Sequence, residues 1–170
     1  MNYFELFNLP VELSINLAQL KATALQLQQQ YHPDRAEDKD KALIQSSEIN
    51  HAYKVLSQVD SRAAYLLSLK KEDHDLDQSI RDLFFLQEAL ELREDLENAT
   101  SEKQILAVKD QVNQAIESLT TAFQGDYHDE QWDSARENVR KLQFFQCVLN
   151  DTNKAEEKLF DDQFDLNDDF

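Results

Sequence analysis

The stretch Tyr31-His32-Pro33-Asp34-Arg35 decides how this 170-residue chain folds, because it ends one helix and opens a loop at a defined point. The residue before a proline is pushed out of the right-handed helical region, so His32 should leave the helix. Pro33 stiffens the loop, and Asp34 should accept hydrogen bonds from nearby backbone N–H groups. We therefore expect His32, Pro33 and Asp34 to form an exposed tip between two helices.

Apolar residues at helical spacing flank this tip on both sides. The face before it is formed by Leu17, Leu20, Ala24, Leu27 and Tyr31, and the face after it by Ser46, Ile49, Tyr53 and Leu56. The spacing predicts antiparallel helices over about 16–31 and 41–57. A short helix over 3–8 precedes them, and a further one opens at about Asp60.

The composition predicts an all-α protein without a bound metal or cofactor. Gly 1 and Pro 2 are too few for the turns that strands and hairpins need. One cysteine, Cys147, cannot form an intramolecular disulfide or hold a cluster, and we expect it to be a small buried apolar residue. With a single glycine, no phosphate-binding loop is expected.

The net charge of −17 is uneven: residues 1–75 carry 8 Lys and Arg against 11 Asp and Glu, and residues 76–170 carry 9 against 23. Such a surface repels phosphate backbones and anionic lipid, so we expect protein partners rather than nucleic acid or membrane. The start of the chain lacks the pattern of a signal peptide, and no stretch has the length of a membrane span. We expect a soluble, cytoplasmic protein.

The charged run 70–75 has no periodicity and predicts a boundary between two domains, 1–75 and 76–160. Three amphipathic helices follow, over about 76–97, from Ser101 onward and from Trp132 onward, and short connections between them predict a three-helix bundle. Gly125 should mark the end of the second. The acidic segment 161–170 is expected to be disordered.

The helix over 76–97 carries two apolar stripes, where a surface helix normally has one. The core stripe is Phe85, Ala89, Leu92 and Leu96. The outer stripe is Leu83, Leu86 and Leu90, displaced by about 120°. Either both stripes are buried against different neighbours, or the outer stripe is an exposed binding surface beside Glu91 and Glu94.

The first domain resembles a J-domain. The resemblance rests on Asn2-Tyr3-Phe4-Glu5-Leu6-Phe7, on the His-Pro-Asp tip and on Ile49-Asn50-x-Ala52-Tyr53-x-x-Leu56, in that order. It implies that the tip binds a DnaK-type ATPase chaperone through His32, Pro33, Asp34 and Arg35, together with Lys21 on the preceding helix. Since J-domains usually carry more basic residues there, we expect weak, salt-tolerant steering by charge.

The second domain resembles the C-terminal domain of the HscB family of iron–sulfur co-chaperones. The resemblance rests on Asp82-Leu83-Phe84-Phe85-Leu86-Gln87-Glu88-Ala89-Leu90-Glu91-Leu92-Arg93-Glu94, Trp132-Asp133 and Val139-Arg140-Lys141-Leu142-x-Phe144. It implies an HscA-like chaperone and an IscU-like scaffold protein as partners. The scaffold-binding positions it implies are Leu86, Gln87, Leu90, Glu91, Arg93, Glu94 and Phe144. Gln87 stands where a bulkier apolar residue is expected.

The sequence is also compatible with two other functions. A general stress-type J-domain co-chaperone shares the tip but leaves the second domain without a specific partner. A di-iron bundle enzyme is suggested by Glu48-x-x-His51, although such a site needs this motif twice. His32 and Asp34 could be paired as acid and base, but the sequence offers no nucleophile, and we expect no catalytic residues.

Overall fold

The structure, a computed structural model, describes residues 1–168, and within them the chain is helical, as the sequence predicts. It divides into two compact units, Met1–His74 and a second that begins at Asp75. None of the helices in the described part combines the length and apolar character that a membrane crossing needs.

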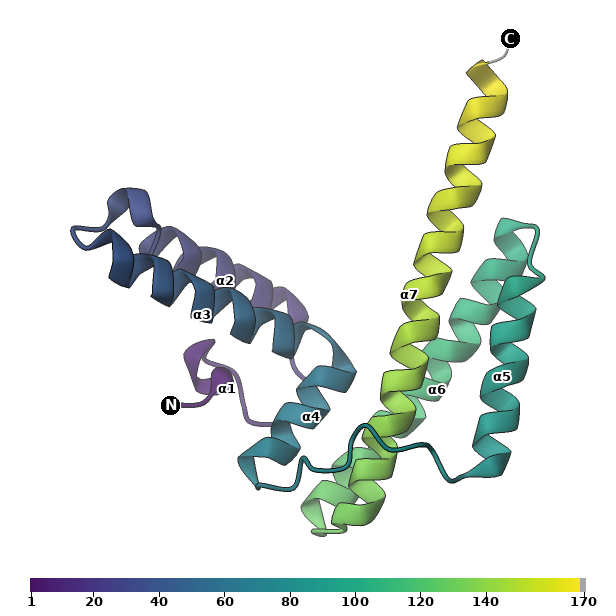
Figure 1. Ribbon diagram of the computed structural model, residues 1–170, viewed down its shortest axis with the longest axis horizontal. Coiled ribbons are helices and arrows are strands. Elements are labelled where there is room, and N and C mark those ends of the chain that lie inside the picture. Colours follow the sequence, from purple (N-terminus) through teal and green to yellow (C-terminus); the bar gives the residue numbers. More distant parts are fainter. Residues whose placement is uncertain (169–170) are drawn as a thin grey trace. The chain divides into compact units, whose positions relative to one another are not determined.

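The first unit is built around an antiparallel helix pair (Figure 1). Its elements are α1 (Tyr3–Leu6), α2 (Leu17–Gln30), the short 3-10 helix η1 (Pro33–Arg35), α3 (Lys39–Ser57) and α4 (Val59–Leu69). Asn16 begins α2 by accepting a hydrogen bond from the N–H of Gln19, and Asp38 begins α3 in the same way. Because both caps are short polar side chains before apolar periodic segments, the sequence sets these boundaries.

The core of this unit is closed by aromatic residues from α1 and by a buried arginine. Phe4 and Phe7 are fully buried, and the ring of Tyr3 stacks on Tyr65 at 4.4 Å between centroids. Arg62 donates to the carbonyls of Leu13 and Leu56, both at 2.7 Å. Burial lowers the pKa of Arg62 to about 10, so it is still charged at neutral pH. Arg62 therefore ties α4 to the loop before α2.

The second unit is a bundle of α5 (Leu83–Glu97), α6 (Glu102–His128) and α7 (Trp132–Asp168), which confirms the three-helix prediction. Its core is apolar and drawn from all three helices: Ala89, Leu96, Ile105, Val108, Val112, Phe145 and Val148. Phe85 and Leu92 pack against it from α5. The core stripe thus faces inward, as expected from its spacing.

The start of α5 corrects the predicted range 76–97. The helix begins at Leu83 because the side chain of Asp82 accepts a hydrogen bond from the N–H of Phe85. The sequence contains this cap, but the apolar residues before Asp82 continue the helical pattern and therefore predict a longer helix. Residues 76–82 form a non-helical connector instead.

Gly125 does not end α6, contrary to prediction. The helix continues to His128, and the turn is made at Glu130, which has a φ of 57°. Long-range contacts hold this last turn together: the carboxylate of Asp126 accepts hydrogen bonds from Ser134 at 2.6 Å and Asn138 at 2.8 Å. These contacts outweigh the weak local preference of glycine for a helix end.

The predicted disordered segment 161–170 also needs correction, because α7 continues to Asp168 and residues 169–170 lie outside the described part. Ala155 and Leu159 still pack against the bundle core, so the helix has tertiary support close to this segment. Extending an existing helix is far easier than starting one. As a result, α7 reaches past the turn that joins α5 to α6 (Figure 1).

Candidate functional site

The tip between α2 and α3 has the backbone that its proline demands. Tyr31 caps the end of α2, and His32 then adopts an extended conformation with φ −65° and ψ 132°. Pro33 starts η1, and Asp38 starts α3 a few residues later. His32 therefore leaves the helix, as predicted, and the tip is a short ordered turn rather than a loose loop.

Within the tip, the hydrogen bond runs opposite to the expected direction. We expected Asp34 to accept from backbone N–H groups, but its own N–H donates to Nδ1 of His32 at 3.2 Å. In this arrangement the imidazole Nδ1 is the acceptor. The carboxylate of Asp34 lies 3.5 Å from the same Nδ1, and the side chains of His32 and Asp34 are 56% and 86% exposed. The imidazole is thus tied to the backbone of Asp34, and both side chains are presented outward.

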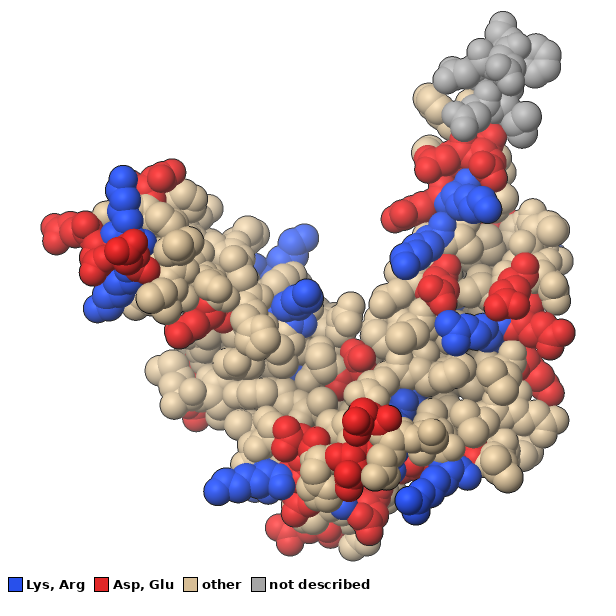
Figure 2. Space-filling view, viewed as in Figure 1, with Lys and Arg blue, Asp and Glu red and all other residues tan. Residues whose placement is uncertain are grey.

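The charges near the tip are mixed in sign. Figure 2 shows basic and acidic side chains side by side at this end of the α2–α3 pair. Arg35, Lys39 and Lys41 are exposed, and so are the nearby acidic residues Asp38 and Asp40. Lys21 is exposed too but lies in the second turn of α2, about 16 Å along the helix from His32. The structure does not bring Lys21 into the tip.

The outer stripe of α5 faces solvent. Leu83 is 78% exposed and Leu90 is 55% exposed, while Leu86 is half-buried. Ala89, one residue before Leu90, is fully buried. The two stripes are therefore not both buried: the core stripe packs inside the bundle, and Leu83 and Leu90 of the outer stripe are exposed.

Polar residues border the outer stripe on α5. Gln87, Glu91 and Glu94 are exposed, and the amide of Gln87 donates to Glu91 at 3.5 Å. Arg93 is half-buried and pairs with Asp151 of α7 at 3.2 Å. Asp151 has no signal in the sequence that would connect it with Arg93, since 58 residues separate them.

Phe144 joins the surface from α7. Its ring meets Phe85 edge-on at 6.4 Å, and the guanidinium of Arg93 lies 5.7 Å from its ring centre. Its side chain is half-buried and packs partly against the core, so it belongs both to the bundle and to the surface. Arg93 thus connects the predicted residues of α5 with Phe144 of α7, and the six predicted residues on α5 lie within about 160° around that helix.

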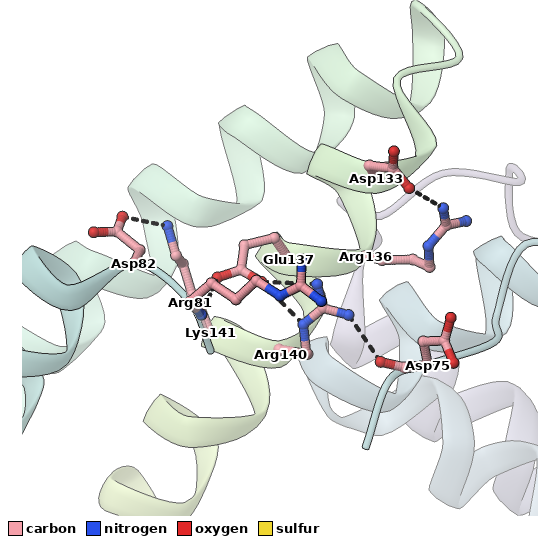
Figure 3. Close-up of polar contacts among 8 residues, drawn as sticks. All are labelled: Asp75, Arg81, Asp82, Asp133, Arg136, Glu137, Arg140 and Lys141. Carbon is pink, nitrogen blue, oxygen red and sulfur yellow. Dashed lines mark hydrogen bonds and ion pairs between the residues drawn. The ribbon is translucent and has the colours of Figure 1, made fainter. Parts of the chain in front are cut away.

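The connector before α5 is held on α7 by a polar clamp, shown in Figure 3. Arg140 donates to the carbonyl of Asp75 at 2.8 Å and pairs with Glu137, which also accepts from the N–H of Arg81 at 3.2 Å. Lys141 pairs with Asp82 at 2.9 Å. The clamp fixes the point at which α5 begins.

Asp82 thus has two roles at one carboxylate. The N–H of Phe85 and, second, the ammonium of Lys141 lower the pKa of Asp82 below its ordinary value. Lys141 also lies 5.0 Å from the ring centre of Phe85. The start of α5 is therefore joined to α7 by both an ion pair and an aromatic contact.

Cys147 is exposed, which corrects its predicted burial. Phe145 and Val148 occupy the core positions of this part of α7. Cys147 precedes Val148 by one residue and is therefore rotated about 100° from it around the helix, away from the core. Among the described residues, no group of three His, Cys, Asp or Glu side chains is arranged to hold a metal ion.

Family models match both units. A model described as the DnaJ domain matches residues 2–65, and one described as the HSCB C-terminal oligomerisation domain matches residues 81–153. The protein therefore combines a J-domain with the C-terminal domain of HscB proteins. A co-chaperone protein HscB homolog from Acinetobacter baumannii (strain SDF) is 63% identical over 172 residues and covers 100% of both chains. The chain belongs to the HscB family, which is a family of co-chaperones and not a class of enzyme.

Solved structures agree with this assignment. The chaperone HscB from Vibrio cholerae is 33% identical, with a TM-score of 0.74 over 94% of this chain and 99% of that one. Human co-chaperone protein HscB is 26% identical, with a TM-score of 0.77 over 92% of this chain and 82% of that one. The two-unit helical architecture is thus common to bacterial and human members.

Proposed function

We propose that this protein binds an IscU-like scaffold, on which iron–sulfur clusters are assembled, and delivers it in the cytoplasm to an HscA-like DnaK-type ATPase chaperone. It stimulates ATP hydrolysis by that chaperone and so aids the maturation of iron–sulfur proteins. The observation that supports this proposal is that one chain carries two exposed surfaces of different chemistry, a polar tip on one unit and an apolar stripe on the other.

The tip is the proposed chaperone contact, through His32, Pro33, Asp34 and Arg35. The hydrogen bond from the N–H of Asp34 to His32 and the fixed φ of Pro33 hold the tip in one shape before binding. Such preorganisation reduces the conformational entropy lost on association. Lys21, farther along α2, adds a single favourable charge at the edge of the contact.

The α5–α7 face is the proposed scaffold contact. Leu86 and Leu90 supply its apolar centre, because burying the half-buried Leu86 and the exposed Leu90 against a partner excludes water from apolar surface. Gln87, Glu91 and Glu94 form its polar edge. Arg93 is oriented by Asp151 and Phe144, so its guanidinium reaches the interface already positioned.

Joining the two surfaces on one chain gives the protein its delivery role. The scaffold is first bound to α5 and α7, and the tip then docks on the chaperone. Binding of the scaffold to the chaperone thereby becomes an intramolecular step within one complex. The effective concentration of a tethered ligand is commonly in the millimolar range. The co-chaperone therefore couples stimulation of ATP hydrolysis to the presence of a client.

The test is the steady-state ATPase rate of an HscA-like chaperone with the co-chaperone, the scaffold, or both. We expect each to stimulate modestly and the combination to stimulate more than the sum. A general DnaK-type chaperone serves as the comparison, and it should respond less. Equal stimulation of both chaperones, with no effect of the scaffold, would instead identify a general stress-type J-domain co-chaperone.

A further inference from the structure

Two large apolar side chains at the start of α5 remain unexplained by the bundle. Leu83 is 78% exposed and Phe84 is 72% exposed, although they occupy the first two positions of the helix. Acidic residues are favoured in a first turn, because the helix dipole is positive there. Two exposed apolar residues at this place stabilise neither the helix terminus nor the core. Their exposure suggests contact with something outside the chain.

The Leu83–Phe84 pair continues the proposed scaffold surface. At about 100° per residue, Leu83 lies within about 20° of Leu90 around the helix and two turns before it. Phe84 lies within about 20° of Glu91 and widens the apolar surface on that side. The pair therefore extends the same face toward the start of α5 and adds apolar area about one turn before Gln87, which belongs to the polar border.

The polar clamp holds this pair in place. Asp82 caps the first turn of α5 through the N–H of Phe85 and pairs with Lys141 of α7, and the N–H of Arg81 is bound by Glu137. First turns of helices fray when their N–H groups lack partners. Here the residues immediately before Leu83 are bound to α7, so the pair is presented from a rigid helix terminus (Figure 3).

We propose that Leu83 and Phe84 are further anchors for the IscU-like scaffold, an inference that rests on the proposed function. The exposed carboxylates that follow the pair along α5 belong to Glu88, Glu91 and Glu94, so the complementary face of the scaffold carries apolar side chains with Lys or Arg along that side. A second copy of this chain fits less well, because two such acidic borders would repel each other.

The experiment compares three double or single variants of the full chain by calorimetric titration with the scaffold. Leu83→Ala/Phe84→Ala should weaken binding about tenfold or more, since truncating two large apolar side chains that become buried in an interface removes much of its binding energy. It should leave the melting temperature and the scaffold-free ATPase stimulation unchanged, because neither side chain packs in the core. Phe160→Ala, at an exposed phenylalanine on α7, is the matched control and should bind like the parent protein.

Leu86→Ala/Leu90→Ala separates this inference from the proposed function. If the parent protein fails to bind the scaffold, the proposed function fails. If the parent binds, Leu86→Ala/Leu90→Ala weakens binding and Leu83→Ala/Phe84→Ala does not, only the present inference is overturned. Sedimentation of the free protein adds one more outcome: a dimer that Leu83→Ala/Phe84→Ala dissociates would assign the pair to self-association and overturn the inference as well.

Discussion

The tip and the α5–α7 face are both exposed, but the chain builds them in opposite ways. The tip is five consecutive residues, Tyr31–Arg35, whose shape follows from one proline and one hydrogen bond within the segment. The α5–α7 face joins residues that are far apart in sequence, such as Arg93 and Asp151. A local surface survives any change that leaves the flanking helices intact, whereas an assembled surface exists only when the bundle packs.

The two surfaces also differ in whether the residues proposed to bind a partner lie next to residues that stabilise the fold. No side chain of His32, Asp34 or Arg35 is buried, so substitutions there should leave the free energy of unfolding nearly unchanged. On α5, exposed Leu90 directly follows fully buried Ala89. A shift of one residue along this helix therefore moves the effect of a substitution from binding to folding.

The strongest test of this contrast is His32→Gln. We expect the variant to fold and melt like the parent protein but to lose stimulation of the chaperone's ATPase. Glutamine can keep a polar group at this position, but it cannot reproduce the imidazole Nδ1 that accepts from the N–H of Asp34. Lys21→Gln is the control and should keep most of the stimulation. Full stimulation by a folded His32→Gln variant would contradict the proposed role of the tip.

The second test separates the two stripes of α5. Leu86→Ala/Leu90→Ala should weaken scaffold binding about tenfold or more and lower the melting temperature only slightly. Leu96→Ala, on the core stripe at 9% exposure, should instead cost about 2–4 kcal/mol of folding stability. Titration calorimetry and thermal melts of both variants check this. Early melting of the first variant and normal melting of Leu96→Ala would reverse the assignment of the stripes.

The third test uses salt to compare the two surfaces. Raising NaCl from about 50 to about 300 mM should weaken scaffold binding several-fold, because Glu91 and Glu94 border that surface and salt screens their attraction to a basic partner. The half-maximal co-chaperone concentration for ATPase stimulation should change by less than about twofold, since the charges near the tip are mixed in sign. Equal salt dependence of the two measurements would show that charge does not distinguish the surfaces.

The smallest expected effect concerns the helix cap Asp82. Asp82→Ala should lower the melting temperature by about 2–5 °C at pH 7, because it removes both the cap and the pair with Lys141. The folded-state pKa of Asp82 is lowered, so its contribution is complete above the unfolded value of about 4 and is lost as the pH falls through the folded value.

The difference in melting temperature between parent and Asp82→Ala should therefore shrink as the pH falls from 7 toward 2.5. Asp82→Asn keeps a capping oxygen and loses only the charge, so its melting temperature should lie between the two. A difference between parent and Asp82→Ala that stays constant over the whole range would contradict a role for the ionised carboxylate.

Much of this fold could be predicted because its signals are local. The helices around the tip follow from apolar spacing and from Asn16 and Asp38 as caps, and the tip follows from Pro33. The core stripe follows from spacings of four, three and four residues along α5. A prediction fails where a contact between helices opposes a local signal. For example, α6 runs past Gly125 because Asp126 accepts hydrogen bonds from Ser134 and Asn138 of α7.

The sequence by itself determined the helices, the tip and the existence of a second apolar stripe, since each depends on residues within a few turns of one another. Only the tertiary structure decided which stripe is exposed, that Cys147 faces outward, and that Arg93 is held by Asp151. The tertiary structure also places Arg81 and Asp82 against α7, which holds the start of α5 where Leu83 and Phe84 are exposed. The physical reason is that exposure and ion pairing depend on which helix faces pack together, and packing joins residues whose distance in sequence carries no signal.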